Sequence, residues 1–298
     1  MIISASRRTD IPAFYAPWFM ERVRAGWCRV PNPVNPRQVS TVALSPDAVD
    51  AVVCWTRWAQ PLIPHLPELQ RRYAVLFLYT LVDYPVGLEP GALSLDRRIE
   101  AFRRVADILG PDRVTWRYDP IVLTPGTDAS FHVDRFRRLA AALRGATSRC
   151  IVSFVDVYRK VRLRLEAAPG PATEIREPTQ ADLALMLPAL CTAAGDNGMR
   201  LQSSAEQRDL AARGVLPGAC LDAGWIEAAT QRRVTHRKDS SQRPACRCVA
   251  SRDIGVYDTC PRGCLYCYAV SDPAHARRNH RRHDPHAPAL LPVSTDAA

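Results

Sequence analysis

The chain contains an unbroken apolar run, YAVLFLYTL, at Tyr73–Leu81. A strand with one face in water alternates apolar and polar residues, whereas a parallel strand covered on both faces is apolar throughout. The run therefore predicts a buried strand of a parallel sheet. Similar runs predict further strands at Ile2–Ser6, Ala51–Trp55, Arg113–Arg117, Cys150–Val155 and Met199–Ser203.

Amphipathic helices are expected between these strands. Ser94 is placed to begin one helix and Gly110 to end it, and Thr179 with Asp182 resembles a capping box at the start of another. Six alternations of strand and helix with a common connection hand predict an α/β fold, either a barrel or an open doubly wound sheet. We expect a (β/α)6-type partial TIM barrel over residues 1–210.

Length and composition set the cellular context that we expect. The chain has 298 residues, of which 47% are hydrophobic, and it contains no apolar run long enough to span a membrane. Met1–Ser6 begins directly in a strand-like run, so we expect no signal peptide, a cytoplasmic location and no membrane partner. In a reducing compartment the ten cysteines are better suited to metal or cluster ligation than to disulfides.

The net charge of +10 includes a basic stretch near the C-terminus, with arginine pairs at 277–278 and 281–282. We expect residues 276–298, which end in a Pro- and Ala-rich run, to form a disordered, solvated tail. The alternative interpretation is an arm that binds nucleic acid.

A cysteine loop, CPRGCLYCY at Cys260–Tyr268, carries the strongest chemical signal. Its C-x3-C-x2-C spacing allows Cys260, Cys264 and Cys267 to ligate one metal centre. A [4Fe–4S] cluster needs four ligands, so three thiolates would leave one iron open to a small molecule. The alternative is a structural zinc site, which usually has C-x2-C pairs and four ligands.

A second group of cysteines precedes this loop, and we assign residues 211–275 to a cysteine-rich iron–sulfur segment that packs on the barrel mouth. Cys220, Cys246 and Cys248 lie in polar stretches and could ligate a second iron–sulfur cluster or a zinc ion. A fourth ligand could come from Ser204, Cys191, His236 or a small molecule. Alternatively, one of the three completes the first site and the others are free thiols.

Polar residues follow the expected strands, at the end where α/β barrels carry their chemistry. The candidate catalytic residues are Arg8, Asp10, Arg117 and Asp119. The candidate cofactor-binding residues are Ser6, Arg7, Glu206 and Tyr266. Arginine suits a carboxylate or phosphate, although Arg8 with Asp10, or Arg117 with Asp119, could equally form ion pairs that tie loops together.

Four segments together resemble an uncharacterised bacterial family, a domain of unknown function whose C-terminal cysteines are similar to the cluster motif of radical S-adenosylmethionine (SAM) enzymes. The segments are Met1–Asp10, Arg117–Pro120, Ser241–Pro244 and Cys260–Tyr268. The resemblance implies a [4Fe–4S] cluster on the three loop cysteines, SAM on the open iron and Tyr266 near adenine. It also implies an electron donor such as flavodoxin or ferredoxin, and a 5′-deoxyadenosyl radical that acts on an unknown substrate.

The chain departs from ordinary radical SAM enzymes in one respect, because their cysteine loop follows the first barrel strand. Here the loop follows a strand-like segment, Asp253–Tyr257, after all six alternations. Either the order is permuted or this segment folds back as an added strand. If the protein is such an enzyme, the cysteine loop must lie over the mouth that bears Asp10 and Asp119.

Two other functions fit the sequence less well. One is a zinc- or cluster-stabilised nucleic-acid-binding protein on an α/β scaffold that uses the basic tail. The other is a metal-dependent hydrolase, which would need histidines and carboxylates at the strand ends. The histidines lie mostly in the tail and in Pro-flanked loops, so the hydrolase ranks last.

Overall fold

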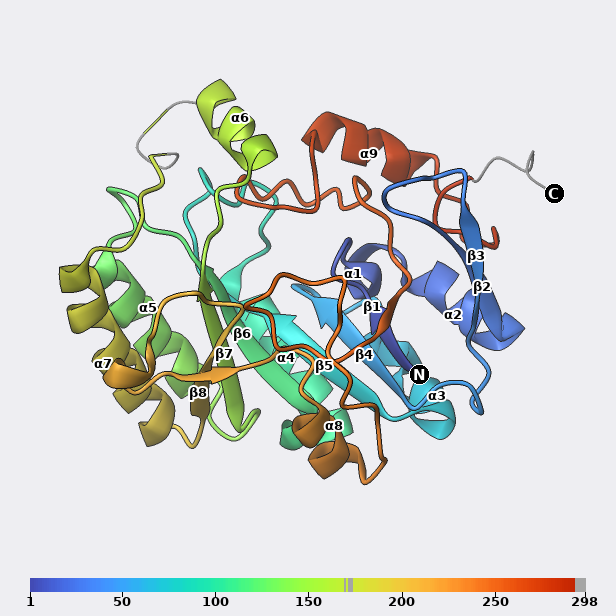
Figure 1. The fold of residues 1–298 in the computed structure, drawn as a ribbon, viewed down its shortest axis with the longest axis horizontal. Helices are drawn as coiled ribbons and strands as arrows, with labels where there is room; N and C mark the ends of the chain where they lie inside the picture. Colours follow the sequence, from blue (N-terminus) through green and yellow to red (C-terminus); the bar gives the residue numbers. More distant parts are fainter. Residues whose placement is uncertain (169, 171–173, 293–298) are drawn as a thin grey trace.

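The fold is built on one sheet of eight strands, in the order β10-β1-β4-β5-β6-β7-β8-β9 (Figure 1). The structure is a computed structural model that describes residues 1–168, 170 and 174–292. All neighbouring strands of the sheet are parallel. The strands are β1 (Ile2–Ala5), β4 (Ala51–Thr56), β5 (Val75–Thr80), β6 (Val114–Ile121), β7 (Arg149–Phe154), β8 (Arg200–Ser204), β9 (Leu216–Gly218) and β10 (Arg252–Asp253). A separate antiparallel hairpin joins β2 (Trp27–Pro31) to β3 (Val39–Ala43).

The α/β class and the six expected strands are confirmed, because β1, β4, β5, β6, β7 and β8 lie where the apolar runs predicted them. The partial barrel is not confirmed. β9 and β10 are the two edges of the sheet, and within the described residues no pairing joins them into a closed barrel. The segment that begins at Asp253 folds back onto β1, where Ser4 pairs with Asp253 in parallel register.

The helices connect and cover the strands. They are α1 (Ile11–Phe14), α2 (Ala16–Ala25), α3 (Leu66–Arg72), α4 (Leu95–Leu109), α5 (Ala129–Ala142), α6 (Arg159–Ala167), α7 (Gln180–Asp196), α8 (Ala223–Thr230) and α9 (Pro273–Arg281). The capping box of Thr179 and Asp182 forms at the start of α7, as expected. Ser94 precedes α4, but its side chain makes no capping hydrogen bond. Within the described residues no helix is both long and apolar enough to cross a membrane.

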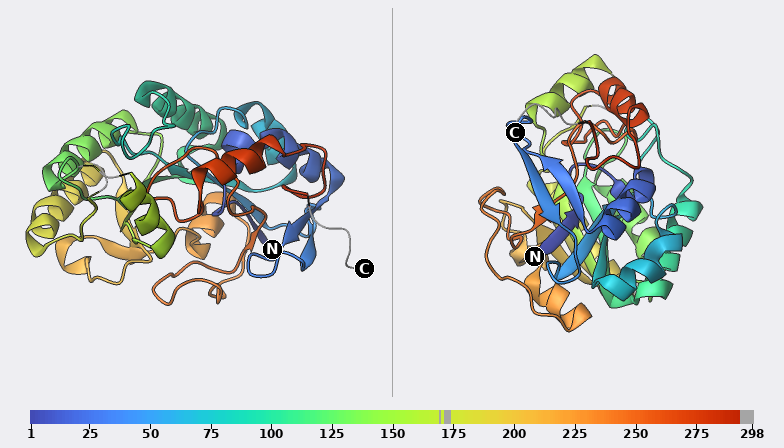
Figure 2. Two further views of the ribbon diagram at one scale, coloured as in Figure 1. Left: turned by 90° about the horizontal axis from the view of Figure 1, so that it is seen from above. Right: turned by 90° about the vertical axis from the view of Figure 1, so that its right-hand side faces the viewer.

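The two faces of the sheet are covered by different layers. On one face, Val52, Phe77 and Trp116 join the larger core, which also contains buried residues of α2, α4, α5 and α7. On the other face, Val53 and Leu76 pack against the chain between β9 and β10, including α8. Figure 2 shows this orange segment on the opposite side of the sheet from α4. Apolar side chains therefore point to both faces of the central strands, which explains their unbroken hydrophobic runs.

The prediction of a disordered tail is wrong for residues 276–292. Residues 273–281 form α9, and Ala289 and Leu290 beyond it are buried. The indole N–H of Trp18 donates to the carbonyl of Ala287 at 3.0 Å, and the backbone N–H of Arg29 donates to that of Pro288 at 2.8 Å. These contacts fasten the basic stretch to α2 and the hairpin. The remainder of the predicted tail, residues 293–298, lies outside the described residues.

Candidate functional site

The cysteine loop begins beside the end of β1 because β10 lies next to β1 in the sheet. The buried carboxylate of Asp253 accepts hydrogen bonds from Ser4 Oγ at 2.8 Å, Ser6 Oγ at 2.6 Å and the backbone N–H of Arg7 at 2.8 Å. Two residues later, a Cβ atom on Gly255 would overlap Ser6. The close backbone approach thus requires glycine, and it directs the chain across the carboxyl end of the sheet.

Asp10 joins this mouth of the sheet to the cysteine loop. Its buried carboxylate accepts from Thr56 Oγ1 at 2.6 Å and from the backbone N–H of Arg57 at 2.9 Å, both at the end of β4. It also forms an ion pair at 3.3 Å with Arg262, which lies between Cys260 and Cys264. The cysteine loop therefore lies at the mouth that bears Asp10, as the enzyme hypothesis requires.

Tyr266 is held in a second buried polar group. Its hydroxyl donates to the Glu89 carboxylate and accepts from Arg57 Nη2 at 2.7 Å, and Arg57 also forms an ion pair with Glu89. Burial raises the pKa of Tyr266 well above its usual value, so the phenol is protonated. The expected role of Tyr266 beside adenine stays a prediction, and any such contact would have to use the ring, because the hydroxyl is occupied.

The outer side of the loop is fastened by Arg164 on α6. Its guanidinium donates to the carbonyl of Leu265 at 3.1 Å, and to the carbonyls of Cys267 and Val270. Three backbone acceptors bound by one side chain fix the path of the loop through its last cysteine.

The loop thiols are in a water-poor, positively charged environment. Cys264 is buried, and Cys260 and Cys267 are partly buried. Burial raises the pKa of Cys260 to about 11, with the nearby Asp10 adding to the effect, and raises the pKa of Cys264 to about 12. The free thiols of Cys260 and Cys264 are therefore protonated at neutral pH, and metal ligation would release their protons.

The surroundings of these thiols suit an anionic thiolate cluster. The charges of Arg262 and Arg57 act on Cys264, and that of Arg164 is close to Cys264 and Cys267. Arg262 Nε is buried without a hydrogen-bond acceptor in the structure. Among the described residues, no three His, Cys, Asp or Glu side chains form a group that could hold a single metal ion, and this includes the three loop cysteines. Three soft ligands on a short loop fit a cluster, which is bound at separate iron atoms.

The remaining charged candidates divide into two cases. Arg117 and Asp119 of β6 form the ion pair that the sequence allowed, and Ser153 donates a further hydrogen bond to Asp119. Arg8 and Asp10 do not pair with each other. Arg8 instead donates to the carbonyl of Gly255 at 3.3 Å, so it fastens the chain that leads to the cysteine loop.

A group of unpaired donors lies between the two sets of cysteines. The guanidinium carbons of Arg7 and Arg117 lie 5.3 Å and 4.9 Å from the ring centroid of Trp55. Arg7 Nη2, Arg117 Nε and Trp55 Nε1 are all buried without an acceptor in the structure. Tyr268 of the cysteine loop donates to the carbonyl of Arg7 at 2.6 Å. An anionic group would satisfy these donors.

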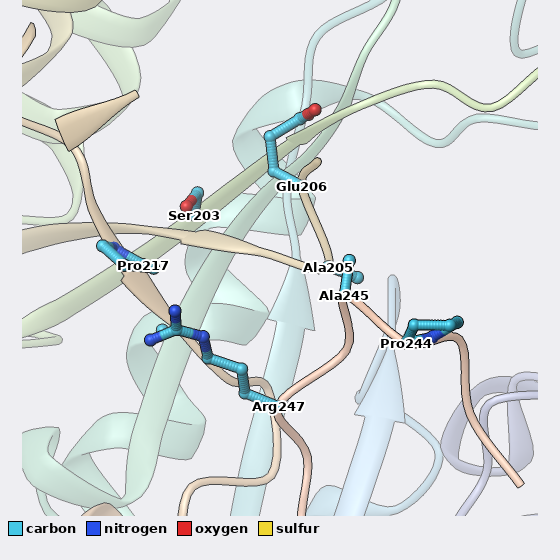
Figure 3. Close-up of a pocket in the computed structure, with 8 residues that line it drawn as sticks. Ser203, Ala205, Glu206, Pro217, Pro244, Ala245 and Arg247 are labelled. Carbon is cyan, nitrogen blue, oxygen red and sulfur yellow. The ribbon is translucent and has the colours of Figure 1, made fainter. Parts of the chain in front are cut away.

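Glu206 lies apart from the cysteine loop, after β8. Its carboxylate accepts from Arg208 Nη1 at 2.9 Å, and it lines a cavity of about 210 Å³ together with Ser203 and Arg247 (Figure 3). Its predicted contact with SAM is not tested. The position of Arg247 between Cys246 and Cys248 links this cavity to the second cysteine group instead.

The structure distinguishes the candidate fourth ligands of that second group. Ser204 Oγ lies 3.1 Å from Cys220 Sγ. Cys191 packs on the opposite face of the sheet, where its thiol is 3.7 Å from the carbonyl of Arg213. His236 is exposed and lies 3.1 Å from Glu227.

Sequence reasoning missed three residues that hold the site together: Glu89, Arg164 and Asp253. Glu89 and Arg164 carry no local signal, because one lies in a Pro-flanked loop and the other is one of several arginines on α6. Asp253 begins the strand-like segment before the loop, and this position is the one sequence feature that could have indicated its role.

The comparison with known families fits this extent of the site. The sequence model of a domain of unknown function, DUF1848, matches residues 2–269. No curated protein and no solved structure matches the chain. The matched range runs from β1 to Ala269, the residue directly after the cysteine loop, and thus includes the whole sheet and all three loop cysteines. The chain therefore belongs to the DUF1848 family.

Proposed function

We propose that the chain is a radical SAM-type iron–sulfur enzyme acting on an unidentified substrate. The observation that carries the proposal is the position of β10. It is the last strand in the sequence but the first in the sheet, beside β1, and the cysteine loop follows its carboxyl end. A loop after the first strand is what the resemblance to radical SAM enzymes implies. We therefore regard the sheet as a permuted relative of their partial barrel, with one face filled by the chain between β9 and β10.

The residues around the loop would have defined tasks. Cys260, Cys264 and Cys267 would ligate a [4Fe–4S] cluster, while Arg57 and Arg262 offset the negative charge of the thiolates. When bound and reduced by a donor such as flavodoxin or ferredoxin, the cluster would supply the electron that cleaves SAM to methionine and a 5′-deoxyadenosyl radical.

The mouth would bind the organic ligands. The unpaired N–H groups of Arg7 and Arg117 can donate to a carboxylate of SAM or of the substrate. Asp10 and Arg8 would act by positioning, because they hold the cysteine loop against the strand ends. Asp119 would orient Arg117 through their ion pair.

The test is anoxic purification, iron and sulfide analysis, and an assay for 5′-deoxyadenosine after reduction in the presence of SAM. We expect wild-type protein to be brown and to form 5′-deoxyadenosine. A variant with Cys260→Ala, Cys264→Ala and Cys267→Ala should form none. Cys191→Ala is the matched control, because this thiol lies on α7 on the opposite face. Wild-type protein without iron, or a triple variant that still cleaves SAM, would refute the proposal.

A second candidate, nucleic-acid binding, is favoured by the exposed arginines of the C-terminal stretch, Arg277, Arg278, Arg281 and Arg282. This function predicts salt-sensitive binding of DNA or RNA that is lost when these four residues become glutamine. Binding that persists in the variant would argue against it.

A further inference from the structure

The fold brings together three sulfur atoms that are far apart in the sequence. Cys220 follows β9, whereas Cys246 and Cys248 precede β10, and all three are buried on the face that the β9–β10 segment covers. Cys248 Sγ accepts a hydrogen bond at 3.4 Å from the backbone N–H of Leu221, the residue after Cys220. The hydroxyl of Ser204 contacts Cys220 at 3.1 Å.

A buried cation beside these sulfurs has no carboxylate partner. Arg149 is 8% exposed, and its guanidinium donates to Gln202 at 3.1 Å, to Thr115 at 3.2 Å and to the carbonyl of Ala219. Its guanidinium carbon also lies 4.9 Å from the ring centroid of Trp225, and among the described residues no carboxylate forms an ion pair with it. The nearest groups that can carry negative charge include Cys220 and Cys248, and the carboxylate of Asp222, which also acts on Arg149, caps α8. A buried unpaired charge is costly, so an anionic centre at the sulfurs would stabilise this arrangement.

Further positive charge faces the same sulfurs from the mouth. Arg7 acts on Cys248, and Arg117 acts on Cys220. Both arginines, as noted above, keep a buried N–H without an acceptor, and so does Trp55, which is 8% exposed. Arg7 also pairs with Asp239 at 3.3 Å and Arg117 pairs with Asp119, so Arg149 is the arginine here whose positive charge an anionic centre would offset.

The chain segments that carry these cysteines line a cavity, although the three cysteines themselves are not among its lining residues. The 210 Å³ cavity is lined by Ser203 and Ala205, which flank Ser204, by Gly218 before Cys220, and by Arg247 between Cys246 and Cys248 (Figure 3). A small molecule in the cavity could therefore reach a centre held by the three thiols.

We propose that Cys220, Cys246 and Cys248 ligate a second iron–sulfur cluster, whose fourth position is filled from the cavity that Arg247 lines. Each thiol transfers one proton to water as its sulfur binds iron. A single zinc ion on the same thiols is the competing outcome, and the sulfide count described below distinguishes it from a cluster. This centre does not depend on SAM cleavage at the first site.

The test replaces the three loop cysteines and measures how much iron and sulfide the protein still binds. A variant with Cys260→Ala, Cys264→Ala and Cys267→Ala, reconstituted without oxygen using ferric iron, a thiol reductant and sulfide, should retain about four iron and four sulfide per chain. Adding Cys248→Ser to this variant should abolish both. Cys191→Ala in the same background should change neither. A first-site variant that binds no iron, or that binds one zinc and no sulfide, overturns the second cluster and leaves the proposed function untouched.

A second measurement covers the case in which loss of Cys248 prevents folding. In the first-site variant, Arg149→Met should lower the reduction potential of the remaining cluster, because a nearby positive charge favours the more negative reduced form. Arg149→Lys, which keeps the charge, should restore most of the potential. An unchanged potential in Arg149→Met places the iron elsewhere and overturns the assignment.

Discussion

Replacing Asp10 by asparagine tests whether this carboxylate fastens the cysteine loop to the sheet. In the structure, Oδ1 accepts from Thr56 Oγ1 at 2.6 Å and from the backbone N–H of Ala13 at 3.2 Å. Oδ2 accepts from the backbone N–H of Arg57 at 2.9 Å and from Arg262 Nη2 at 3.3 Å. An asparagine can keep one oxygen, so its amide group would have to face two donors.

The expected decrease in the free energy of unfolding follows from these contacts. Hydrogen bonds to a charged group contribute about 1.5–3 kcal/mol each, and breaking a buried ion pair costs about 3–5 kcal/mol. Because the two lost bonds include the ion pair, we expect Asp10→Asn to lower the free energy of unfolding by about 4 kcal/mol. Arg262 would then be a buried cation without its partner, and the loop should open locally.

The assay combines urea unfolding of the metal-free protein with hydrogen exchange of residues 260–268. We expect a lower unfolding midpoint and faster exchange in this loop. Asp50→Asn is the control, because Asp50 is 41% exposed and pairs with the amino group of Met1. Exposed pairs contribute about 0.2–1 kcal/mol. A change within about 1 kcal/mol for Asp10→Asn, with unaltered exchange in the loop, would refute the assigned role.

Three further predictions test other parts of the structure. Arg164→Met removes three hydrogen bonds to loop carbonyls, so exchange of residues 265–270 should accelerate, whereas unchanged exchange would contradict the assigned contact. Gly255→Ala places a Cβ against Ser6 and should destabilise the protein by about 1–3 kcal/mol in urea unfolding. Gly126→Ala is the control and should have little effect, because the space around Gly126 is open. Equal effects of the two substitutions would contradict this packing. Burial lowers the pKa of His132 from 6.5 to about 4. The neutral form is therefore favoured in the folded state, and about 3 kcal/mol of stability should be lost as the pH falls from 6.5 to 4. His132→Asn should flatten that part of the stability profile, and a wild-type profile already flat there would contradict the assignment.

The sequence by itself determined the layered architecture. The runs that became β4 and β5 are apolar on both faces, and such strands are stable only inside a parallel sheet with both faces covered. The capping box of α7 could also be predicted from the sequence, because all of its hydrogen bonds lie within four consecutive residues, from Thr179 to Asp182. Local periodicity and local hydrogen bonds are properties that a single sequence carries.

The cysteine loop was recognisable from its spacing, and so were Asp10 and Arg117 as polar strand ends. The ion pair of Arg117 with Asp119 was one of two pairs that the sequence allowed, whereas the partner of Asp10 is Arg262, which is too distant in sequence for a local pattern to indicate. The ordered C-terminal stretch escaped prediction for a related reason. Its composition is that of a solvated tail, but Leu290 is buried, and neighbouring carbonyls accept from Trp18 and Arg29.

Only the tertiary structure decided where the chemistry gathers. β10 has two residues, too few for periodicity to mark, and it is placed by pairing with β1 and by the hydrogen bonds of Asp253 to Ser4 and Ser6. The meeting of Cys220 with Cys246 and Cys248 likewise depends on how the chain after β9 crosses the sheet. Contacts between residues so distant in sequence are selected by the burial of the whole face, which no local pattern encodes.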